Sequence, residues 1–244
     1  MCGILGEFSF GRPLIDQGHF NKILLQSKNR GPDHTGYYSN KKNLQFGFNR
    51  LKIIDLTENG NQPIFSQDRR FLMVFNGEIY NYIEIKKKLE SYNIQFKGNG
   101  DTEVIVNAFS IFGLKKTIDM LDGMFAIGLF DNKKEQLSLL RDFAGIKPLH
   151  YGYNKNILIF ASQYNQVASH PVFKNESVNK EVLKLYLNQH FISAPYGLLK
   201  NTFQLAPGEI IHFNKGGHIS KNKYWIFPKY LKPAINNSKD AEDI

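Results

Sequence analysis

The sequence predicts an α+β fold in which antiparallel sheets have helices packed on them. Apolar segments of strand length outnumber helical segments, and most of them are joined by short turns or by a single helix. The chain has 244 residues, of which 42% are hydrophobic. This length allows one large domain or two small ones, with enough apolar surface for a substantial core.

Eight segments have the short length and apolar content of strands. Arg30-Gly31-Pro32-Asp33 is typical of a turn, and a polar, proline-containing loop follows at residues 57–63. From residue 124 onward, four short strands follow one another with turns between them. The predicted strands span residues 2–9, 44–55, 71–75, 124–131, 136–141, 150–153, 157–161 and 208–213.

Four segments have the apolar spacing of helices. Asp101 stands where it can cap the third of them, and Gly113 is expected to stop that helix. Beyond Trp225, prolines and asparagines indicate a linker or a tail rather than a core element. The predicted helices span residues 20–27, 81–92, 101–112 and 180–188.

The composition argues against several classes of protein. A single cysteine rules out an internal disulfide framework and fits a reducing compartment. No basic segment precedes the apolar start of the chain, so we expect no signal peptide. The apolar run at residues 124–130 is far shorter than a membrane span. We therefore expect a cytoplasmic protein without a membrane partner.

The net charge of +9 is compatible with a nucleic acid or an acidic surface as partner. The lysines are scattered, however, and no basic helix is interleaved with aromatic residues. We therefore expect a solvated, lysine-rich surface and no nucleic-acid partner. The seven histidines lack the spacing of metal ligands, so no metal site is predicted.

Cys2 is the only cysteine, and only Met1 stands before it. Once Met1 is removed, Cys2 carries both a thiol and a free α-amine. A thiolate is the reactive nucleophile, and an α-amine with a pKa of about 7.7–8.0 is partly unprotonated near neutral pH. The two groups form a nucleophile–base pair like that of a catalytic N-terminal threonine. A cysteine without function at a frayed terminus is the alternative interpretation.

A series of short motifs extends this observation to about residue 225. Each motif is weak alone, since Asn-Gly by itself is a common turn, but their order along the chain is specific. The motifs are Met1-Cys2-Gly3-Ile4, Arg30-Gly31-Pro32-Asp33, Asn49-Arg50-Leu51 with Ile53-Ile54-Asp55, Gln62-Pro63, Phe75-Asn76-Gly77-Glu78-Ile79-Tyr80-Asn81, Gly100-Asp101-Thr102-Glu103, Asp122-Gly123-Met124-Phe125-Ala126, Arg141-Asp142, Gly145-Ile146-Lys147-Pro148-Leu149, Phe160-Ala161-Ser162 and Leu205-Ala206-Pro207-Gly208. In this order they resemble the class II glutamine amidotransferase domains, and those of the asparagine synthetase family in particular.

The resemblance implies the fold of N-terminal-nucleophile hydrolases, a four-layer αββα sandwich with two antiparallel sheets. It implies a glutaminase domain over residues 1–213, followed at residues 214–244 by a linker leading toward a synthetase domain that this chain lacks. The implied reaction is hydrolysis of glutamine to glutamate and ammonia through a thioester. The ammonia would serve amide synthesis, as in the conversion of aspartate to asparagine, on an ATP-dependent partner.

The resemblance also assigns the catalytic roles. Cys2 is the implied nucleophile, with its own amine as proton acceptor. The Asn76 side chain and the Gly77 N–H are the implied donors to the oxyanion of the tetrahedral intermediate. Glycine at this position would permit close approach of the backbone to a ligand. Without the surrounding motifs, Asn76-Gly77 would be interpreted as a hairpin turn.

Free glutamine carries an α-carboxylate and an α-ammonium group, so its pocket needs a cation and an anion. Arg50 is the implied clamp for the carboxylate, because a guanidinium can bind it bidentately. Asp101 is the implied partner of the ammonium group, with Glu78 nearby, and Leu51 and Ile53 complete the implied substrate-binding set. Taken alone, Arg50 would suggest a surface salt bridge and Asp101 a helix N-cap.

Several charged residues of the motifs are expected to support the site rather than to react. Arg30 and Asp33 are expected to order a loop over the pocket. Arg141, Asp142 and Lys147 are expected to support the fold as a buried or half-buried ionic turn.

The chain departs from the family pattern at a few positions. Many relatives have His-Arg where this chain has Phe48-Asn49, and Ala-Ser-Glu where it has Ala161-Ser162-Gln163. The clamp position survives the first change. The second removes a charge where a partner domain would lie, which puts the coupling between domains in doubt.

Family members continue into a synthetase domain with a Ser-Gly-Gly-x-Asp-Ser pyrophosphate-binding loop, and this motif does not occur before Ile244. Either the chain is a fragment or its ammonia acceptor is a separate chain. We expect no cofactor in this chain, with ATP and magnesium only in the synthetase partner. A homodimer is also compatible with the resemblance.

Two other functions stay open from the sequence, and a third is disfavoured. The glutaminase could feed another acceptor, such as a sugar or a different carboxylate, because acceptor choice belongs to the absent domain. The domain could also bind glutamine without catalysis. A papain-like protease needs a partner histidine and asparagine in a cleft, and a nucleophile at the extreme terminus beside an amino-acid clamp argues against it.

Overall fold

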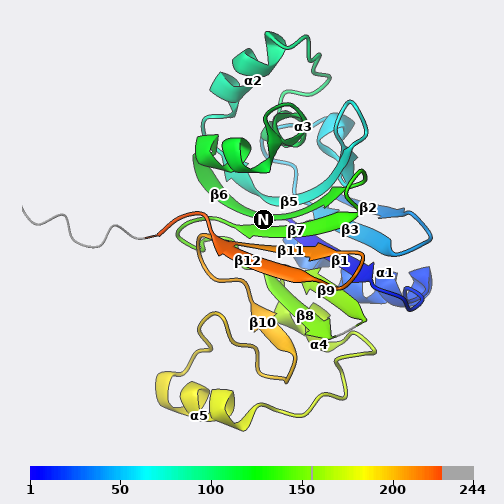
Figure 1. The fold of residues 1–244 in the computed structure, drawn as a ribbon, viewed down its shortest axis with the longest axis vertical. Coiled ribbons are helices and arrows are strands. Elements are labelled where there is room, and N and C mark those ends of the chain that lie inside the picture. The colour runs from blue at the N-terminus through cyan, green and yellow to red at the C-terminus, as the bar shows by residue number, and fades with distance from the viewer. Residues whose placement is uncertain (155, 227–244) are drawn as a thin grey trace, which may run out of the picture.

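Within residues 1–154 and 156–226, which the computed structural model describes, two six-stranded antiparallel sheets stack face to face between helical layers (Figure 1). The first sheet has the strand order β10-β8-β9-β1-β3-β2, and the second has the order β12-β11-β7-β6-β5-β4. The strands of the first sheet are β1 (Gly3–Ser9), β2 (His34–Ser39), β3 (Leu44–Arg50), β8 (His150–Asn154), β9 (Ile157–Ala161) and β10 (Thr202–Gln204). Those of the second are β4 (Ile64–Phe65), β5 (Phe71–Ile79), β6 (Gly123–Asp131), β7 (Gln136–Arg141), β11 (Glu209–Asn214) and β12 (Ile219–Lys223).

Helices cover the outer faces of both sheets. Helices α2 (Tyr82–Glu90) and α3 (Asp101–Met120) pack on the second sheet, where their apolar residues share a core with β5 and β6. Helices α1 (Gln17–Leu25) and α4 (Tyr164–Ala168) pack on the first sheet, and α5 (Lys180–Gln189) lies beyond β10 (Figure 1). This is the predicted sandwich. No helix of the described chain is long and apolar enough to span a bilayer.

The two sheets approach each other closely around Phe160, a fully buried residue of β9. A Cβ atom added to Gly6 on β1 would lie 2.2 Å from the Phe160 ring, and one added to Gly128 on β6 would lie 2.3 Å from it. The ring of the first sheet therefore contacts a glycine in each sheet. Cores of this density resist added volume, so this contact sets the spacing between the sheets.

Most predicted elements are present, with changes at their ends. The strand predicted over residues 44–55 ends at Arg50, because the chain leaves the sheet there, and β5 continues past Phe75 to Ile79. The helix that opens at Asp101 is interrupted at Gly113, which has φ 77° and ψ 170°, and then resumes as far as Met120. The strands and α-helices of the described chain that the sequence did not predict are β2, β4, β10, β12 and α4.

The expected linker at residues 214–244 lies partly within the described chain. Ile219–Lys223 forms β12, which pairs antiparallel with β11 in the second sheet. Residues 227–244 lie outside the described residues.

The fold brings the start of the chain to the ends of strands from both sheets. Cys2 directly precedes β1, which pairs with β3 so that Gly3 lies opposite Asn49. Arg50 is thus the last residue of the strand that pairs with the segment beginning at Cys2. The end of β5, which belongs to the other sheet, lies across from them and lines the same pocket.

Candidate active site

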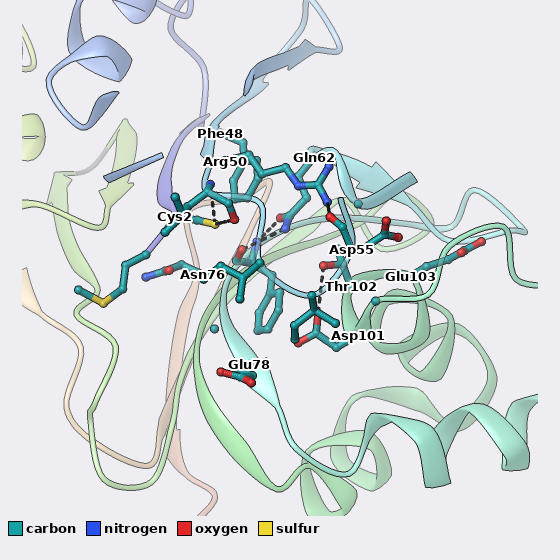
Figure 2. Close-up of a pocket in the computed structure, with 18 of the residues that line it drawn as sticks. Cys2, Phe48, Arg50, Asp55, Gln62, Asn76, Glu78, Asp101, Thr102 and Glu103 are labelled. Carbon is teal, nitrogen blue, oxygen red and sulfur yellow. Dashed lines mark hydrogen bonds between the residues drawn. The ribbon is translucent and has the colours of Figure 1, made fainter. Parts of the chain in front are cut away.

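A pocket with a volume of about 240 Å³ lies between the start of β1, the ends of β3 and β5, and the beginning of α3. It gathers all of the site residues predicted from the sequence, which come from four separate segments. In the view of Figure 2, Cys2 and Asn76 lie on one side of the pocket, and Asp55, Asp101 and Glu103 lie on the other. The predicted residues that line it are Cys2, Arg50, Leu51, Ile53, Asn76, Gly77, Glu78 and Asp101.

The Cys2 thiol is half-buried at the wall of the pocket. The Leu51 N–H donates a hydrogen bond to the Cys2 sulfur, with 3.4 Å between the nitrogen and Sγ, and the Leu51 carbonyl oxygen lies 3.7 Å from Sγ. Burial raises the pKa of the Cys2 thiol, whereas the Leu51 N–H, the N-terminal amine and Arg50 oppose that shift. Activation of this sulfur therefore depends on a base close to it.

The N-terminal amine is the candidate base, since it interacts electrostatically with the Cys2 thiol. In the structure this amine belongs to Met1, which also lines the pocket. Burial lowers the pKa of the amine, and the positive charges of Arg30 and Lys147 lower it further. Arg30 also donates from Nε to the Cys2 carbonyl oxygen at 3.1 Å. An amine on Cys2 itself, as the sequence predicts for the processed chain, would lie next to the sulfur.

Asn76 and Gly77 lie inside strand β5, opposite Ala126 and Phe125 of β6, so the alternative of a hairpin turn is wrong. The Asn76 side chain is 1% exposed, and its Nδ2 is buried without a hydrogen-bond partner among the described residues. A buried donor without a partner is costly in a folded protein. A ligand oxygen in the pocket would satisfy it.

The Gly77 N–H points to the same edge of β5 as the backbone groups of Phe75 and Ile79, because strand residues alternate in direction. On that edge, the Gln62 side chain bonds both backbone groups of Phe75, and Asp101 accepts from the Ile79 N–H. A Cβ at Gly77 would lie 2.3 Å from the Met124 carbonyl oxygen. Glycine is therefore required by the neighbouring strand, in addition to any approach of a ligand.

Arg50 is 5% exposed, so it is not the surface residue that the alternative of a salt bridge assumed. Its guanidinium donates to the carbonyl oxygens of Asp55 and Thr57 and, at 2.8 Å, to Asn61 Oδ1. Gly60 leaves room for it, since an added Cβ would lie 2.1 Å from Nη2. None of the ion pairs in the described chain involves Arg50. Its charge is thus available to an anionic ligand.

Asp101 is the first residue of α3 and is 5% exposed. The expectation of an N-cap at this position is wrong, because the cap is Gly100 and the Asp101 carboxylate accepts from the Ile79 N–H at 3.0 Å. Burial raises the pKa of Asp101 to about 6, and the charge of Glu78 acts in the same direction. A cationic ligand would favour the ionised form.

Two of the predicted apolar residues differ in exposure. Leu51 is half-buried beside the Cys2 sulfur, whereas Ile53 is 67% exposed on the loop that follows. No group of three or more histidine, cysteine, aspartate or glutamate side chains within the described residues is arranged to hold a metal ion.

Lys147 is one of the pocket residues that the sequence did not predict as part of the site. It is 6% exposed and lines the pocket, although the motif suggested a role in fold support alone. Its backbone is held on both sides, because its N–H donates to Asp142 Oδ2 at 3.0 Å and its carbonyl accepts from Arg141 Nε at 2.9 Å. Arg141 and Asp142 bond backbone groups rather than each other, so they support this turn without forming an ion pair.

The supporting loop and the departures from the family pattern also have clear positions. Asp33 accepts from the Lys52 N–H at 2.8 Å and so holds the start of the loop after β3. Phe48 lines the pocket, whereas Asn49 is turned toward α1 and donates to the Leu24 carbonyl oxygen at 2.7 Å. Gln163 lies outside the pocket, and its Oε1 is buried without a hydrogen-bond partner in the described chain.

Comparisons with a family model and with curated proteins agree on one family for this chain. The family model described as a glutamine amidotransferase domain matches residues 1–225. A Methanocaldococcus jannaschii protein described as a glutamine-hydrolysing asparagine synthetase is 36% identical over 262 residues, which cover 100% of this chain and 50% of that protein. Asparagine synthetases 1 and 2 of Bacillus subtilis are 33% and 38% identical over 96% and 75% of this chain, and over 36% and 24% of their own lengths. The chain therefore spans half or less of these relatives.

Solved structures share the fold. Glutamine phosphoribosylpyrophosphate amidotransferase of Bacillus subtilis, complexed with ADP and GMP, has a TM-score of 0.64 at 18% identity, over 92% of this chain and 50% of that one. A structure described as the allosteric regulatory enzyme of purine biosynthesis has a TM-score of 0.65 at 17% identity, over 92% of this chain and 49% of that one. These similarities show the N-terminal-nucleophile hydrolase sandwich.

Proposed function

Because the chain belongs to the glutamine amidotransferase domain family, we propose that it hydrolyses the side-chain amide of free glutamine to glutamate and ammonia. The observation that carries this proposal is the buried Asn76 Nδ2, which lacks a partner in the described chain and lines the same pocket as the Cys2 sulfur. A nucleophile and a donor without a partner in one pocket are what cleavage of a carboxamide requires.

The proposed reaction has two steps. In the first, the Cys2 sulfur attacks the amide carbon of glutamine and its proton passes to the N-terminal amine. Asn76 Nδ2 and the Gly77 N–H donate to the resulting oxyanion. The amine returns the proton to the leaving nitrogen, so that ammonia departs and a thioester forms. In the second, water attacks the thioester, glutamate leaves and the thiol is restored.

The charges of the pocket support recognition of a free amino acid. We propose that Arg50 binds the α-carboxylate, since it is buried and forms no ion pair in the described chain. Asp101, with Glu78, would bind the α-ammonium group, and Leu51 and Ile53 would contact the ligand from the loop. A glutamine within a peptide lacks both end charges and would bind poorly.

We propose that the ammonia serves an ATP-dependent synthetase unit that converts aspartate to asparagine. Support comes from the curated relatives, which are described as glutamine-hydrolysing asparagine synthetases and are at least twice as long as the matched region. ATP and magnesium would be bound by that unit. The reaction steps above use only side chains, backbone groups and water of the glutaminase pocket.

The proposed location is the cytoplasm, because an unpaired cysteine nucleophile is compatible with a reducing compartment. A homodimer is the proposed assembly of the complete enzyme. Light scattering on the purified protein, alone and with a synthetase partner, would test the assembly.

The function is tested with intact-mass analysis followed by an assay of glutamate release. We expect the active protein to have lost Met1, since the amine otherwise belongs to the wrong residue. A protein without Met1 that releases no glutamate from glutamine would contradict the proposed function. Addition of an asparagine synthetase-type chain with aspartate and ATP should yield asparagine, and its absence would redirect the search to another acceptor.

A further inference from the structure

The loop from residue 51 to residue 59 crosses the pocket and has one buried residue, Asp55. Its apolar residues Ile53, Ile54 and Leu56 are exposed by 67%, 39% and 69%, whereas Asp55 is exposed by 7%. A charged residue is rarely the most buried member of a loop. Asp55 is therefore the anchor of this loop, and its contacts show what the anchor holds.

The backbone of Asp55 contacts one end of the pocket. Its carbonyl oxygen accepts a hydrogen bond from Nη2 of Arg50, the proposed carboxylate clamp. The guanidinium also donates to the carbonyl oxygen of Thr57, two residues further along the loop. The direction of the guanidinium thus depends on where residues 55–57 lie.

The side chain of Asp55 contacts the other end. Oδ2 accepts from the Asn99 N–H at 3.1 Å, and Asn99 stands two residues before Asp101, the proposed ammonium partner. The packing is close, because an added Cβ at Gly98 would lie 2.8 Å from Oδ2 and one at Gly100 would lie 3.1 Å from the Asp55 Cβ. Figure 2 shows Asp55 on the side of the pocket near Asp101 and Thr102.

The carboxylate of Asp55 is held in place by Thr57. Oδ1 accepts from the Thr57 N–H at 2.8 Å and from the Thr57 hydroxyl at 2.6 Å. Burial disfavours the charge, but the bonds from Thr57 and Asn99 and the charge of Arg50 outweigh it and lower the pKa of Asp55. Hydrogen bonds to an ionised acceptor are stronger than those to a neutral one. The link to Asn99 is therefore a rigid one at neutral pH.

We propose that Asp55 is a positioning residue that fixes the separation between Arg50 and Asp101, and with it the preference of the pocket for ligands with both end charges. The proposal rests on the proposed hydrolysis of free glutamine. Rigid placement of two binding groups converts two weak contacts into one strong, selective one. Asp55 touches neither the sulfur nor the proposed oxyanion donors, so its effect is on binding rather than on the chemical step.

The first test compares Asp55→Asn with wild type and with Asp68→Asn. An asparagine at position 55 has a single acceptor oxygen, which cannot serve both Asn99 and Thr57, so the link is broken at one end at constant size. Asp68 is a matched control outside the pocket, since its carboxylate accepts from the Arg70 N–H at 3.1 Å and from the Ser110 hydroxyl on α3 at 2.6 Å. We expect Asp55→Asn to raise KM for glutamine at least tenfold with kcat within about threefold of wild type, and Asp68→Asn to change neither.

The second test measures selectivity. The ratio of kcat/KM for glutamine to that for its analogue without the α-amine, 4-carbamoylbutanoate, should be large for wild type and at least fivefold smaller for Asp55→Asn. If Asp55 only stabilised the loop, Asp55→Asn would lower kcat/KM for glutamine and for the analogue by the same factor. Thr57→Val is a milder variant, because Thr57 is exposed and loses only its hydroxyl. It should raise KM about threefold, and it decides the question if Asp55→Asn does not fold.

The outcomes separate the two proposals. If wild type releases glutamate but Asp55→Asn, or Thr57→Val in its place, keeps KM and the selectivity ratio within twofold, the role of Asp55 is overturned while the proposed function stands. A loss in kcat with unchanged KM also overturns it. A wild-type protein without Met1 that releases no glutamate overturns the function itself.

Discussion

The Leu51 N–H points at the Cys2 sulfur, with 3.4 Å between the nitrogen and Sγ. Leu51 directly follows Arg50, the last residue of β3. The residue whose N–H bonds the proposed nucleophile and the residue proposed to bind the α-carboxylate are therefore adjacent in the chain. A glutamine bound by Arg50 would have its position fixed relative to the sulfur by a single strand end.

Replacement of the sulfur tests the nucleophile. Cys2→Ala should abolish glutamate release, because no other cysteine is present in the chain, and it should leave glutamine binding intact. Release is measured with glutamate dehydrogenase and binding by calorimetry. Glutamate release at the wild-type rate would remove Cys2 from the mechanism.

Asn76→Ala should lower kcat about 10²–10³-fold with little change in KM, since loss of one oxyanion donor costs about this much. The physical reason is that Nδ2 has no partner in the described chain and is free to bind an oxygen that develops charge. Asn107→Ala is the matched control, because this buried asparagine already donates to the Glu103 carbonyl oxygen at 2.9 Å. An Asn76→Ala variant with wild-type kcat would show that the donor is not used.

Arg50→Ala should weaken the binding of glutamine by about 2–5 kcal/mol, the cost of truncating one partner of a buried charge pair. KM for glutamine should rise accordingly. Arg70→Ala is the control. Arg70 forms an ion pair with Asp131, with 2.8 Å between Nη2 and Oδ2, and neither residue lines the pocket. Steady-state kinetics with glutamine decides the matter. An unaltered KM in Arg50→Ala would contradict the clamp.

The affinity for glutamine should fall at acid pH because of Asp101. Burial raises the pKa of Asp101 to about 6, so below pH 6 the carboxyl group is increasingly protonated and cannot pair with an ammonium group. We expect the dissociation constant to rise about tenfold for each pH unit below 6. Asp101→Asn should bind weakly at every pH and without this dependence, and an identical pH profile in the variant would refute the assignment.

Lys147→Met should shift the acid limb of the kcat/KM profile toward higher pH. Burial, Arg30 and Lys147 all lower the pKa of the Met1 amine, and Lys147 lines the same pocket as Cys2. We expect its positive charge to lower the pKa of a Cys2 amine in the same way, so its removal would raise that pKa and the neutral amine would appear only at higher pH. Lys87→Met, on the exposed side of α2, is the control and should leave the profile unchanged. Lys147→Arg keeps the positive charge, so this variant should have nearly the wild-type pH profile. Coincident profiles for wild type and Lys147→Met would contradict this electrostatic role.

The sequence predicted the core strands well because their apolar content is concentrated between clear turn signals. Strands β7 and β9 have the predicted bounds. Strand β2 was not predicted because none of its residues is fully buried, and β12 because all of its residues are exposed. Such strands depend on pairing with β3 and β11 rather than on their own hydrophobic pattern.

The pocket residues were predicted from the order of the motifs, not from any one of them. Asn76-Gly77 alone suggested a turn, and only the long pairing of β5 with β6 shows that it is strand. Lys147 was assigned to fold support, as part of an ionic turn with Arg141 and Asp142. Its position in the pocket depends on how Arg141 and Asp142 fold the turn, which is three-dimensional information.

The close contact of Phe160 with Gly6 and Gly128 has a consequence for heat inactivation. Cys2 precedes a strand of the first sheet, whereas Asn76 belongs to the second. Any swelling of the interior that separates the sheets by a fraction of an ångström would draw the sulfur away from its amide donor, although every strand kept its pairing. Warming should thus silence turnover at temperatures where circular dichroism still reports an intact protein.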